Sequence, residues 1–253
     1  MNRAITALLS LVLTVSVGAG RAAAQGLDRG ASEPLSWING VRSASSLAPL
    51  LPDPVLSLCA ARWSAVLAAT GVLSHRGADG STVLDRYRSV GGTEAHVGEI
   101  IGAGPDLGSV EKAWAGSDEH SGLVRDPGWT HVGWGMSSAG HSDVWVVVFA
   151  EKLVKDLALV EKSGSLLVSG TFIPESAARA ALYAGLDVLP PASWDGAARR
   201  FSFVVPPESI PGYFRLGFVT ADGAFLLTNA FTWPPGRESP EAQDRSAGPG
   251  QSP

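Results

Sequence analysis

In the first half of the chain, the spacing of apolar residues alternates between helical and extended periods. The clearest helix begins at Asp53-Pro54, because aspartate is a favoured N-cap and proline fits the first helical position. Gly71 ends this helix. Its apolar residues recur at helical spacing: Leu56, Cys59, Ala60, Trp63 and Leu67. A second helix is predicted over 106–114, with one apolar face formed by Leu107, Val110 and Trp114.

Strand spacing begins after Asp126-Pro127. Val132, Trp134 and Met136 alternate with other residues, and Ala139-Gly140 then turns the chain. The run from Val144 to Ala150 is continuously apolar, which is typical of a central strand covered on both faces. Together with the helices, these strands predict an α+β domain over residues 34–152.

From about Asp156 onward the apolar spacing is that of strands throughout. The alternating positions are Leu166, Val168 and Phe172, then Phe201, Phe203 and Val205, then Phe214, Leu216 and Phe218, and finally Phe225, Leu227 and Phe231. Asp222-Gly223 is a strong hairpin signal. This pattern of short strands predicts a small immunoglobulin-like β-sandwich over 156–233, joined to the first domain by a short connection. Residues 234–253 are rich in proline, lack large apolar residues and are predicted to be disordered.

The N-terminus has the three parts of a secretory signal peptide. Arg3 is followed by an apolar run from Ala4 to Val17, and Ala22-Ala23-Ala24 provides the small residues of a cleavage site. The run is shorter than the ~20 residues of a membrane-spanning helix. We therefore predict a signal peptide over 1–24 and a secreted or periplasmic protein, with an uncleaved anchor as the alternative.

Composition narrows the possible partners and chemistry. The net charge of −5 argues against binding to nucleic acid or to an anionic membrane surface. Cys59 is the only cysteine, so the chain has no internal disulfide. Its place in the apolar helical pattern favours a buried, inert thiol.

Three short segments carry the candidate chemistry. They are Leu73-Ser74-His75, Gly98-Glu99-Ile100 and the segment from Trp114 to His120. Neutral histidine and ionised glutamate bind divalent metals and transfer protons near neutral pH. We expect His75, Glu99 and His120 to face one cleft.

The same residues stand in the order found in a known family. Residues 34–152 resemble a bacterial member of the CAP superfamily, named for cysteine-rich secretory proteins, antigen 5 and plant pathogenesis-related class 1 proteins. The matching positions are Asn39 and Arg42 in an opening helix, Pro49-Leu50, Ala60, Trp63, Ser74-His75, Gly80, Arg86, Gly98-Glu99-Ile100, Trp114, Ser117, His120, Val132-Gly133-Trp134-Gly135, and a last strand from Trp145 to Phe149. The resemblance does not cover residues 156–253.

The resemblance implies an α–β–α sandwich, secretion, and a cleft with a tetrad of two histidines and two glutamates. His75, Glu99 and His120 match three of these positions. The second glutamate falls near Ser117 in this chain, and the resemblance gives no reason to substitute the neighbouring Asp118 or Glu119. The fourth position is therefore unfilled.

Three hypotheses describe what this site does. His75, His120 and Glu99 would form a three-ligand set with an open position, suited to Zn²⁺ carrying a water. Without metal, Glu99 would hold one imidazole in a chosen tautomer. The third hypothesis is a hydrogen-bonded polar cluster that orders the cleft and performs no chemistry.

At the level of the whole protein, we predict a secreted binding module rather than an enzyme. Its cleft would bind a metal, lipid or peptide, and the β-sandwich would present the cleft or dock on a protein partner. The alternative is a secreted, metal-assisted hydrolase, and a third possibility is a purely structural envelope or matrix component. No acyl-transfer nucleophile with an adjacent base is recognisable, although Ser117 lies three residues before His120 and would share its side of a helix.

The remaining histidines and the tryptophans are interpreted more simply. His96, His131 and His141 are predicted to be exposed or in turns. Trp63, Trp114 and Trp145 occupy positions typical of a core.

Overall fold

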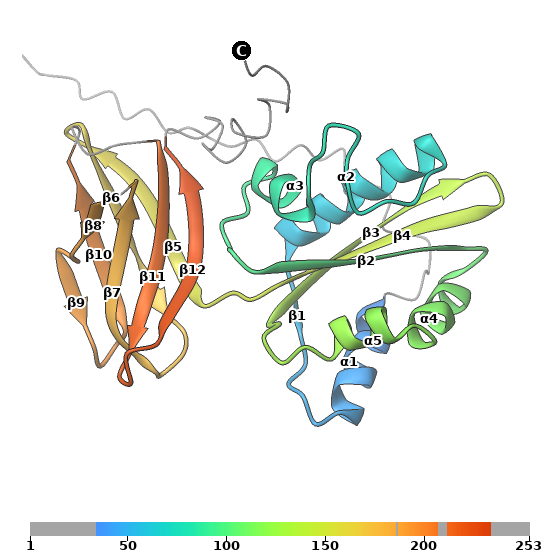
Figure 1. Ribbon diagram of the computed structural model, residues 1–253, viewed down its shortest axis with the longest axis horizontal. Helices are drawn as coiled ribbons and strands as arrows, with labels where there is room; N and C mark the ends of the chain where they lie inside the picture. The colour runs from blue at the N-terminus through green and yellow to red at the C-terminus, as the bar shows by residue number, and fades with distance from the viewer. Residues whose placement is uncertain (1–33, 186, 207–211, 234–253) are drawn as a thin grey trace, which may run out of the picture. The chain divides into compact units, whose positions relative to one another are not determined.

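The computed structural model describes residues 34–185, 187–206 and 212–233 (Figure 1). The signal peptide predicted over 1–24 and the tail predicted over 234–253 lie outside these residues. Within them, no helix is both long and apolar enough to cross a membrane.

The first part of the chain is a three-layer sandwich. Its helices are α1 (Pro34–Ala44), α2 (Pro54–Thr70), α3 (Val83–Ser89), α4 (Leu107–Ala115) and α5 (Asp118–Val124). Its strands are β1 (Leu51–Pro52), β2 (Val97–Gly104), β3 (His131–Ala139) and β4 (Ser142–Ala150), in the sheet order β1-β3-β4-β2. Helices α2 and α3 cover one face of this sheet, and α1, α4 and α5 cover the other (Figure 1). The α+β expectation for this region is confirmed.

The central position of strand β4 explains the continuous apolar run from Val144 to Ala150. It lies between β3 and β2, so both of its faces are covered. Trp145, Val147 and Phe149 join the core cluster that includes residues of α1, α4 and α5. Val144, Val146, Val148 and Ala150 join the cluster formed with α2. Because successive side chains of a strand point to opposite faces, a strand buried on both sides must be apolar at every position.

Helix α2 begins and ends as its sequence predicts. The Asp53 side chain accepts hydrogen bonds from the backbone N–H groups of Val55 and Leu56, which satisfies two of the free donors of the first turn. Gly71 ends the helix with a left-handed φ of 69°. Helix α4 likewise begins after the N-cap Asp106 and buries Leu107, Val110 and Trp114. Cys59 is 1% exposed, as expected, and burial raises the pKa of its thiol to about 11.

Strand β3 differs from the simple alternation expected for it. Val132 is buried, but Met136 on the same face is 39% exposed, so this face leaves the core towards the end of the strand. The opposite face carries Gly133 and Gly135, which lie directly against α2. A Cβ atom on Gly133 would lie 2.1 Å from the backbone nitrogen of Ser57. The helix can approach the sheet this closely only because these side chains are absent.

Two further antiparallel sheets form the second part of the chain. Their strands are β5 (Val154–Lys162), β6 (Ser165–Phe172), β7 (Ala177–Ala184), β8 (Asp187–Leu189), β9 (Ser193–Asp195), β10 (Arg200–Val205), β11 (Tyr213–Thr220) and β12 (Phe225–Thr232). The sheet orders are β5-β6-β10-β9 and β12-β11-β7-β8. One hydrophobic cluster contains residues of both sheets, including Val168, Phe203 and Phe218, which are all fully buried. The alternation predicted for β6, β10 and β11 is therefore present.

The alternation predicted for β12 is wrong at its start. Phe225 is 46% exposed, whereas Leu226 packs against the core cluster and Phe231 is buried. The register between β11 and β12 shifts between Leu216 and Gly217, which leaves Thr228 as an extra residue in β12. A β-bulge of this kind exchanges the two faces of a strand, so residues before and after it point inward with opposite parity.

The close approach of α2 to the sheet predicts an asymmetry between two glycines. Gly133→Ala should lower the free energy of unfolding by at least about 1–3 kcal/mol, because the new methyl group meets backbone atoms of α2 that cannot move aside. Gly40→Ala, in α1, has no atom within 4 Å of the added Cβ and should be neutral or stabilising by about 0.5–1 kcal/mol. Urea unfolding of both variants measures the difference. Equal stabilities would contradict the packing described here.

Candidate functional site

The centre of the candidate site is the carboxylate of Glu99, which lies in β2 and has a side chain only 2% exposed. Ile101, two residues further along β2, packs into the hydrophobic cluster beneath α2. Ile100 packs into the cluster of the opposite layer. Because side chains alternate along a strand, Glu99 faces the α2–α3 side with Ile101. Strand β2 is an edge strand, so this carboxylate lies near the rim of the sheet.

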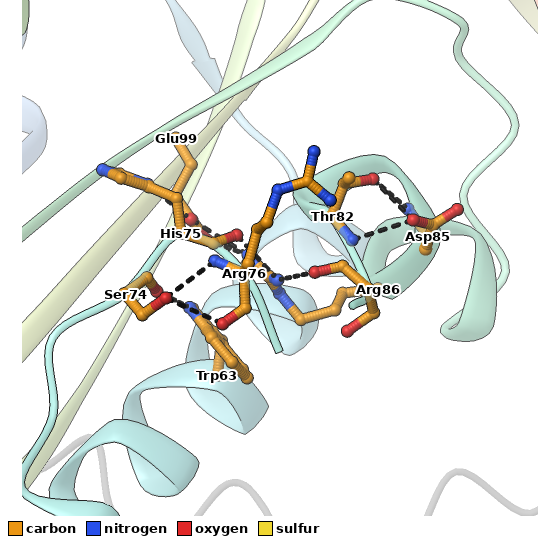
Figure 2. A network of polar contacts seen from close by, with 9 residues as sticks. Trp63, Ser74, His75, Arg76, Thr82, Asp85, Arg86 and Glu99 are labelled. Atoms are coloured by element: carbon orange, nitrogen blue, oxygen red, sulfur yellow. Dashed lines mark hydrogen bonds and ion pairs between the residues drawn. The ribbon is translucent and has the colours of Figure 1, made fainter. Parts of the chain in front are cut away.

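Arg86 of α3 neutralises the buried carboxylate. One terminal nitrogen, Nη2, donates to both oxygens of Glu99 at 2.9 and 2.8 Å (Figure 2). The other, Nη1, donates to the backbone carbonyls of His75 and Ser81, each at 3.2 Å. The guanidinium also lies over the ring of Trp63, 3.9 Å from its centroid. A buried charge needs such partners, because it has lost its hydration. The one buried nitrogen of this guanidinium that lacks a hydrogen-bond partner is Nε.

Helix α3 is positioned for this contact by its own first turn. Thr82 and Asp85 form a capping box, in which the Thr82 side chain accepts from the Asp85 N–H and the Asp85 carboxylate accepts from the Thr82 N–H. The cap fixes where the helix starts, and Arg86 follows one residue later on the side that faces β2.

His75 lies in the loop between α2 and α3, directly against Glu99. Its Nδ1–H donates to Glu99 Oε1 at 2.9 Å, because an ionised carboxylate can only accept. This contact fixes the ring and leaves Nε2 as the nitrogen that is free to bind something else. The side chain is 59% exposed. Figure 2 shows His75, Arg86 and Glu99 converging from the loop, the helix and the strand.

The backbone of the loop is held on both sides of His75. The indole Nε1–H of Trp63 donates to the carbonyl of Ser74 at 3.1 Å, and Arg86 holds the carbonyl of His75 itself. The hydroxyl of Ser74 is bonded to the backbone of Arg76, both as donor and as acceptor. The exposed imidazole is therefore attached to an ordered stretch of chain.

His120 comes from the opposite helical layer, in α5. The expectation that Ser117 and His120 share one face of a helix is wrong, because Ser117 is the N-cap of α5. Its side chain accepts a hydrogen bond from the backbone N–H of His120 at 3.3 Å. Serine competes well for this role because its oxygen satisfies a free donor of the first turn.

The two imidazoles have opposite pKa shifts. The hydrogen bond to Glu99 raises the pKa of His75, against a smaller effect of burial. Burial lowers the pKa of His120, and the charge of His75 lowers it further. The negative charge of Glu119 acts on both rings and raises both pKa values slightly. The structure thus brings His75 and Glu99 into contact and places His120 within electrostatic range of His75.

The three-ligand metal set does not fit this geometry. Both oxygens of Glu99 already accept from Arg86, and one of them also accepts from His75. A guanidinium cation beside the carboxylate disfavours a second cation there. Over the residues that the structure describes, no group of three or more His, Cys, Asp or Glu side chains is arranged to hold a metal ion. The two imidazoles remain as donors, with Glu99 as the group that orients one of them.

The other histidines behave differently from these two. His96 is exposed and packs against Trp129 at a centroid distance of 4.2 Å, and His141 lies exposed in the turn before β4. His131 is half-buried in β3, and its Nδ1 is 2.9 Å from the Thr130 hydroxyl, so its predicted exposure is only partly correct. Trp63, Trp114 and Trp145 are buried, as expected.

Arg86 and Trp63 are site residues that the sequence did not reveal as such. Both stand among the positions of the family resemblance, but neither has a spacing that assigns it to Glu99. The one signal that could have identified Arg86 is its positive charge, since a glutamate buried in a strand requires a cation nearby.

The family assignment comes from a family model. The model of "CAP: Cysteine-rich secretory protein family" matches residues 35–149. This part of the chain is a CAP domain.

Solved structures resemble less than half of the chain, at low identity. An outer surface protein of Borrelia burgdorferi is 23% identical over 46% of this chain and 88% of its own, with a TM-score of 0.44. An extracellular protein of Bacillus anthracis that contains a SCP domain is 22% identical over 47% of this chain and 39% of its own, with a TM-score of 0.44. Venom allergen-like protein 4 of Schistosoma mansoni is 13% identical over 47% of this chain and 88% of its own, with a TM-score of 0.38. With TM-scores this low, these similarities add no weight to the assignment. No curated protein matches the chain.

The pKa shifts give a test of the site's geometry. In NMR titrations His75 should titrate above the ordinary value of about 6.5 and His120 below it. The proton on His75 therefore stabilises the fold below about pH 6.5, and this contribution is lost as the pH rises through the raised pKa. Glu99→Gln should lower the pKa of His75, because the neutral amide no longer favours the imidazolium. Glu119→Gln is the matched control and should lower it less. An unshifted His75 would contradict the contact with Glu99.

Proposed function

We propose that this chain is an exported CAP-domain protein that binds a ligand through His75 and His120. One observation carries the proposal: an exposed imidazole is held in a fixed tautomer by a buried, fully paired carboxylate. Orientation of this kind leaves Nε2 of His75 directed away from Glu99 and ready to make a new bond. His120 is near enough for the charge of His75 to lower its pKa, and we propose that it contributes the second ring.

The alternative hypothesis, a polar cluster that only orders the cleft, explains less of this arrangement than ligand binding does. Arg86 already donates to both oxygens of Glu99, so the fold gains little from adding an imidazole that is more than half exposed. Ordering the loop at Ser74 and His75 also costs conformational entropy. A ligand that needs His75 in one place offsets that cost.

The ligand of this site is a metal ion or a polar group of a lipid or peptide. For a divalent metal such as Zn²⁺, His75 Nε2 and a ring nitrogen of His120 would be the protein ligands, and Glu99 would orient His75 behind them. A bound metal would supply a Lewis acid for an oxygen atom of a further ligand. With only two protein donors, the affinity for metal should be modest. A lipid or peptide would instead accept a hydrogen bond from His75 and use His120 as a neutral partner.

Hydrolysis is the second candidate function, and the opposite pKa shifts of the histidines favour it. A pair whose pKa values are pushed apart can serve as acid and base. The described residues offer no activated nucleophile, however. Cys59 is buried with a raised pKa, Ser117 caps α5, and the hydroxyl of Ser74 is bonded to the backbone of Arg76. Binding is therefore the better supported function.

The rest of the chain completes the proposal. Residues 1–24 would act as a signal peptide and deliver the protein to the periplasm or the exterior. Residues 156–233 would form an immunoglobulin-like sandwich that presents the CAP domain or docks on a protein partner. Two four-stranded antiparallel sheets around one hydrophobic cluster support this fold, and the boundaries of the domains remain predictions.

Calorimetric titration with Zn²⁺ tests the metal form of the proposal. The wild-type protein should bind about one ion, and both His75→Ala and His120→Ala should weaken binding at least tenfold, because each removes one of only two nitrogen donors. His141→Ala removes an exposed imidazole in a turn and should bind as the wild type does. Binding that survives both site substitutions would place the metal elsewhere.

Peptide and ester substrates test the second candidate. We expect no turnover above that of buffer, because no hydroxyl or thiol in the described residues is hydrogen-bonded to the imidazole of His75 or His120. The decisive comparison is the wild-type protein with His120→Ala, assayed with and without added Zn²⁺. Turnover that depends on His120 would replace binding by hydrolysis as the function of the site.

A further inference from the structure

A cavity of about 420 Å³ lies beside the start of β5, and the proposed function makes no use of it. Its walls come from the segment 91–94 before β2, from His131 and Lys152, from β5, and from Ile173 after β6. These residues all belong to one compact unit of the chain. None of the three candidate site residues lines the cavity. Its volume falls within the roughly 300–1,000 Å³ of typical small-molecule sites.

The most buried charged group at this cavity is the carboxylate of Glu94, whose side chain is 6% exposed. The phenol of Tyr87 donates to its oxygen Oε2. Burial and the charge of Glu94 raise the pKa of Tyr87, so the phenol keeps its proton and remains a donor. The other oxygen, Oε1, accepts no hydrogen bond from any residue that the structure describes. Tyr87 does not line the cavity whereas Lys152 does, so Oε1, on the lysine side, is the oxygen that faces it.

The charge of Glu94 is only partly balanced by Lys152. The lysine Nζ donates to Asp53 Oδ2 at 2.6 Å and lies 3.8 Å from Glu94 Oε1, which is beyond hydrogen-bond length. One ammonium group therefore serves two carboxylates, and one negative charge is left over. A buried carboxylate in this condition favours a further cation beside it.

The backbone around Glu94 holds the carboxylate in place. The N–H of Ala95 donates to the carbonyl of Thr228, and the N–H of Ala230 donates to the carbonyl of Thr93, each at 2.6 Å. Glu94 thereby forms an antiparallel bridge with Asn229 of β12. The open oxygen is thus presented from a fixed stretch of chain.

The remaining polar groups of the cavity do not supply the missing positive charge. Burial and the charge of Lys152 lower the pKa of His131, so its ring is uncharged at neutral pH. Lys155 and Asp156 are both exposed, and their opposite charges stand next to each other in sequence. The excess charge at the cavity is therefore negative, and it belongs to Glu94.

We propose that this cavity binds a small primary amine, with its ammonium group on Glu94 Oε1 and its alkyl chain on the apolar wall. That wall is formed by Val154, Leu157, Leu159 and Ile173. Ile173 is 42% exposed, and a bound alkyl chain would cover it. A metal ion fits less well than an ammonium, because the described side chains offer no group of three metal ligands here.

Butylammonium is the probe for this site, and butan-1-ol is its uncharged counterpart. Calorimetry is run on the purified chain in phosphate buffer with a chelator, so the outcome does not depend on any metal at His75 and His120. Butylammonium should bind at one site, and butan-1-ol should bind at least about threefold more weakly, because it lacks the charge-assisted hydrogen bond. Failure to bind butylammonium at millimolar concentration would overturn the proposal and leave the His75 site untouched.

A third probe distinguishes the two sources of such an ammonium group. Nα-acetyl-lysine amide carries it on a peptide residue, whereas butylammonium is a free amine. Tighter binding of the lysine derivative would identify a lysine side chain as the ligand, and weaker binding would identify a free amine. Both results support an ammonium on Glu94.

Two pairs of variants locate the binding. Glu94→Gln should weaken butylammonium binding about tenfold or more, because it keeps the size of the side chain and removes its charge. Glu161→Gln removes an exposed carboxylate of β5 outside the cavity and should have no effect. Ile173→Trp should fill the cavity and also weaken binding about tenfold or more, whereas Val160→Trp, at an exposed valine outside it, should not. Equal affinities within either pair would show that the amine binds elsewhere.

His131 gives a readout that does not rely on affinity. The charge of Glu94 raises the pKa of this imidazole, and a bound ammonium would offset that charge. In NMR titrations, saturating butylammonium should therefore lower the pKa of His131 further, and should leave that of His141, in the turn before β4, unchanged. The effect on His131 should be lost in Glu94→Gln. A pKa of His131 that does not respond to bound amine would overturn the proposed position of the ammonium group.

Discussion

The ion pair between Arg86 and Glu99 is the constraint on which the candidate site depends. Glu99 lies in an edge strand with a side chain only 2% exposed, so its charge is almost entirely removed from solvent. Breaking a buried pair by removing one partner typically costs about 3–5 kcal/mol, because the remaining charge is left without compensation. The contact therefore fixes α3 against β2. It also fixes the intervening loop, since the same guanidinium holds the backbone of His75.

The edge position of β2 explains how two helical layers contribute to one site. A central strand such as β4 has helices packed on both faces and neighbours on both sides, so a polar site there would be inaccessible. At the edge, side chains from the loop after α2 and from α5 can come within electrostatic range of each other. His75 comes from one layer and His120 from the other, and their opposite pKa shifts reflect this difference in surroundings.

Local sequence determined most of the secondary structure. The Asp53 cap, the Gly71 stop and the continuous apolar run of β4 each act through neighbouring residues, so their outcome could be predicted from spacing alone. The types and order of His75, Glu99 and His120 also indicated a shared site.

Tertiary structure decided what no local pattern contains. The bulge at Thr228 reversed the faces of β12, because a register is set by the partner strand. Ser117 became a helix cap, and Arg86, far from Glu99 in sequence, took both oxygens of the carboxylate that the metal hypothesis required. Long-range pairing of charges depends on which side chains the fold buries together, and that is fixed only when the layers have packed.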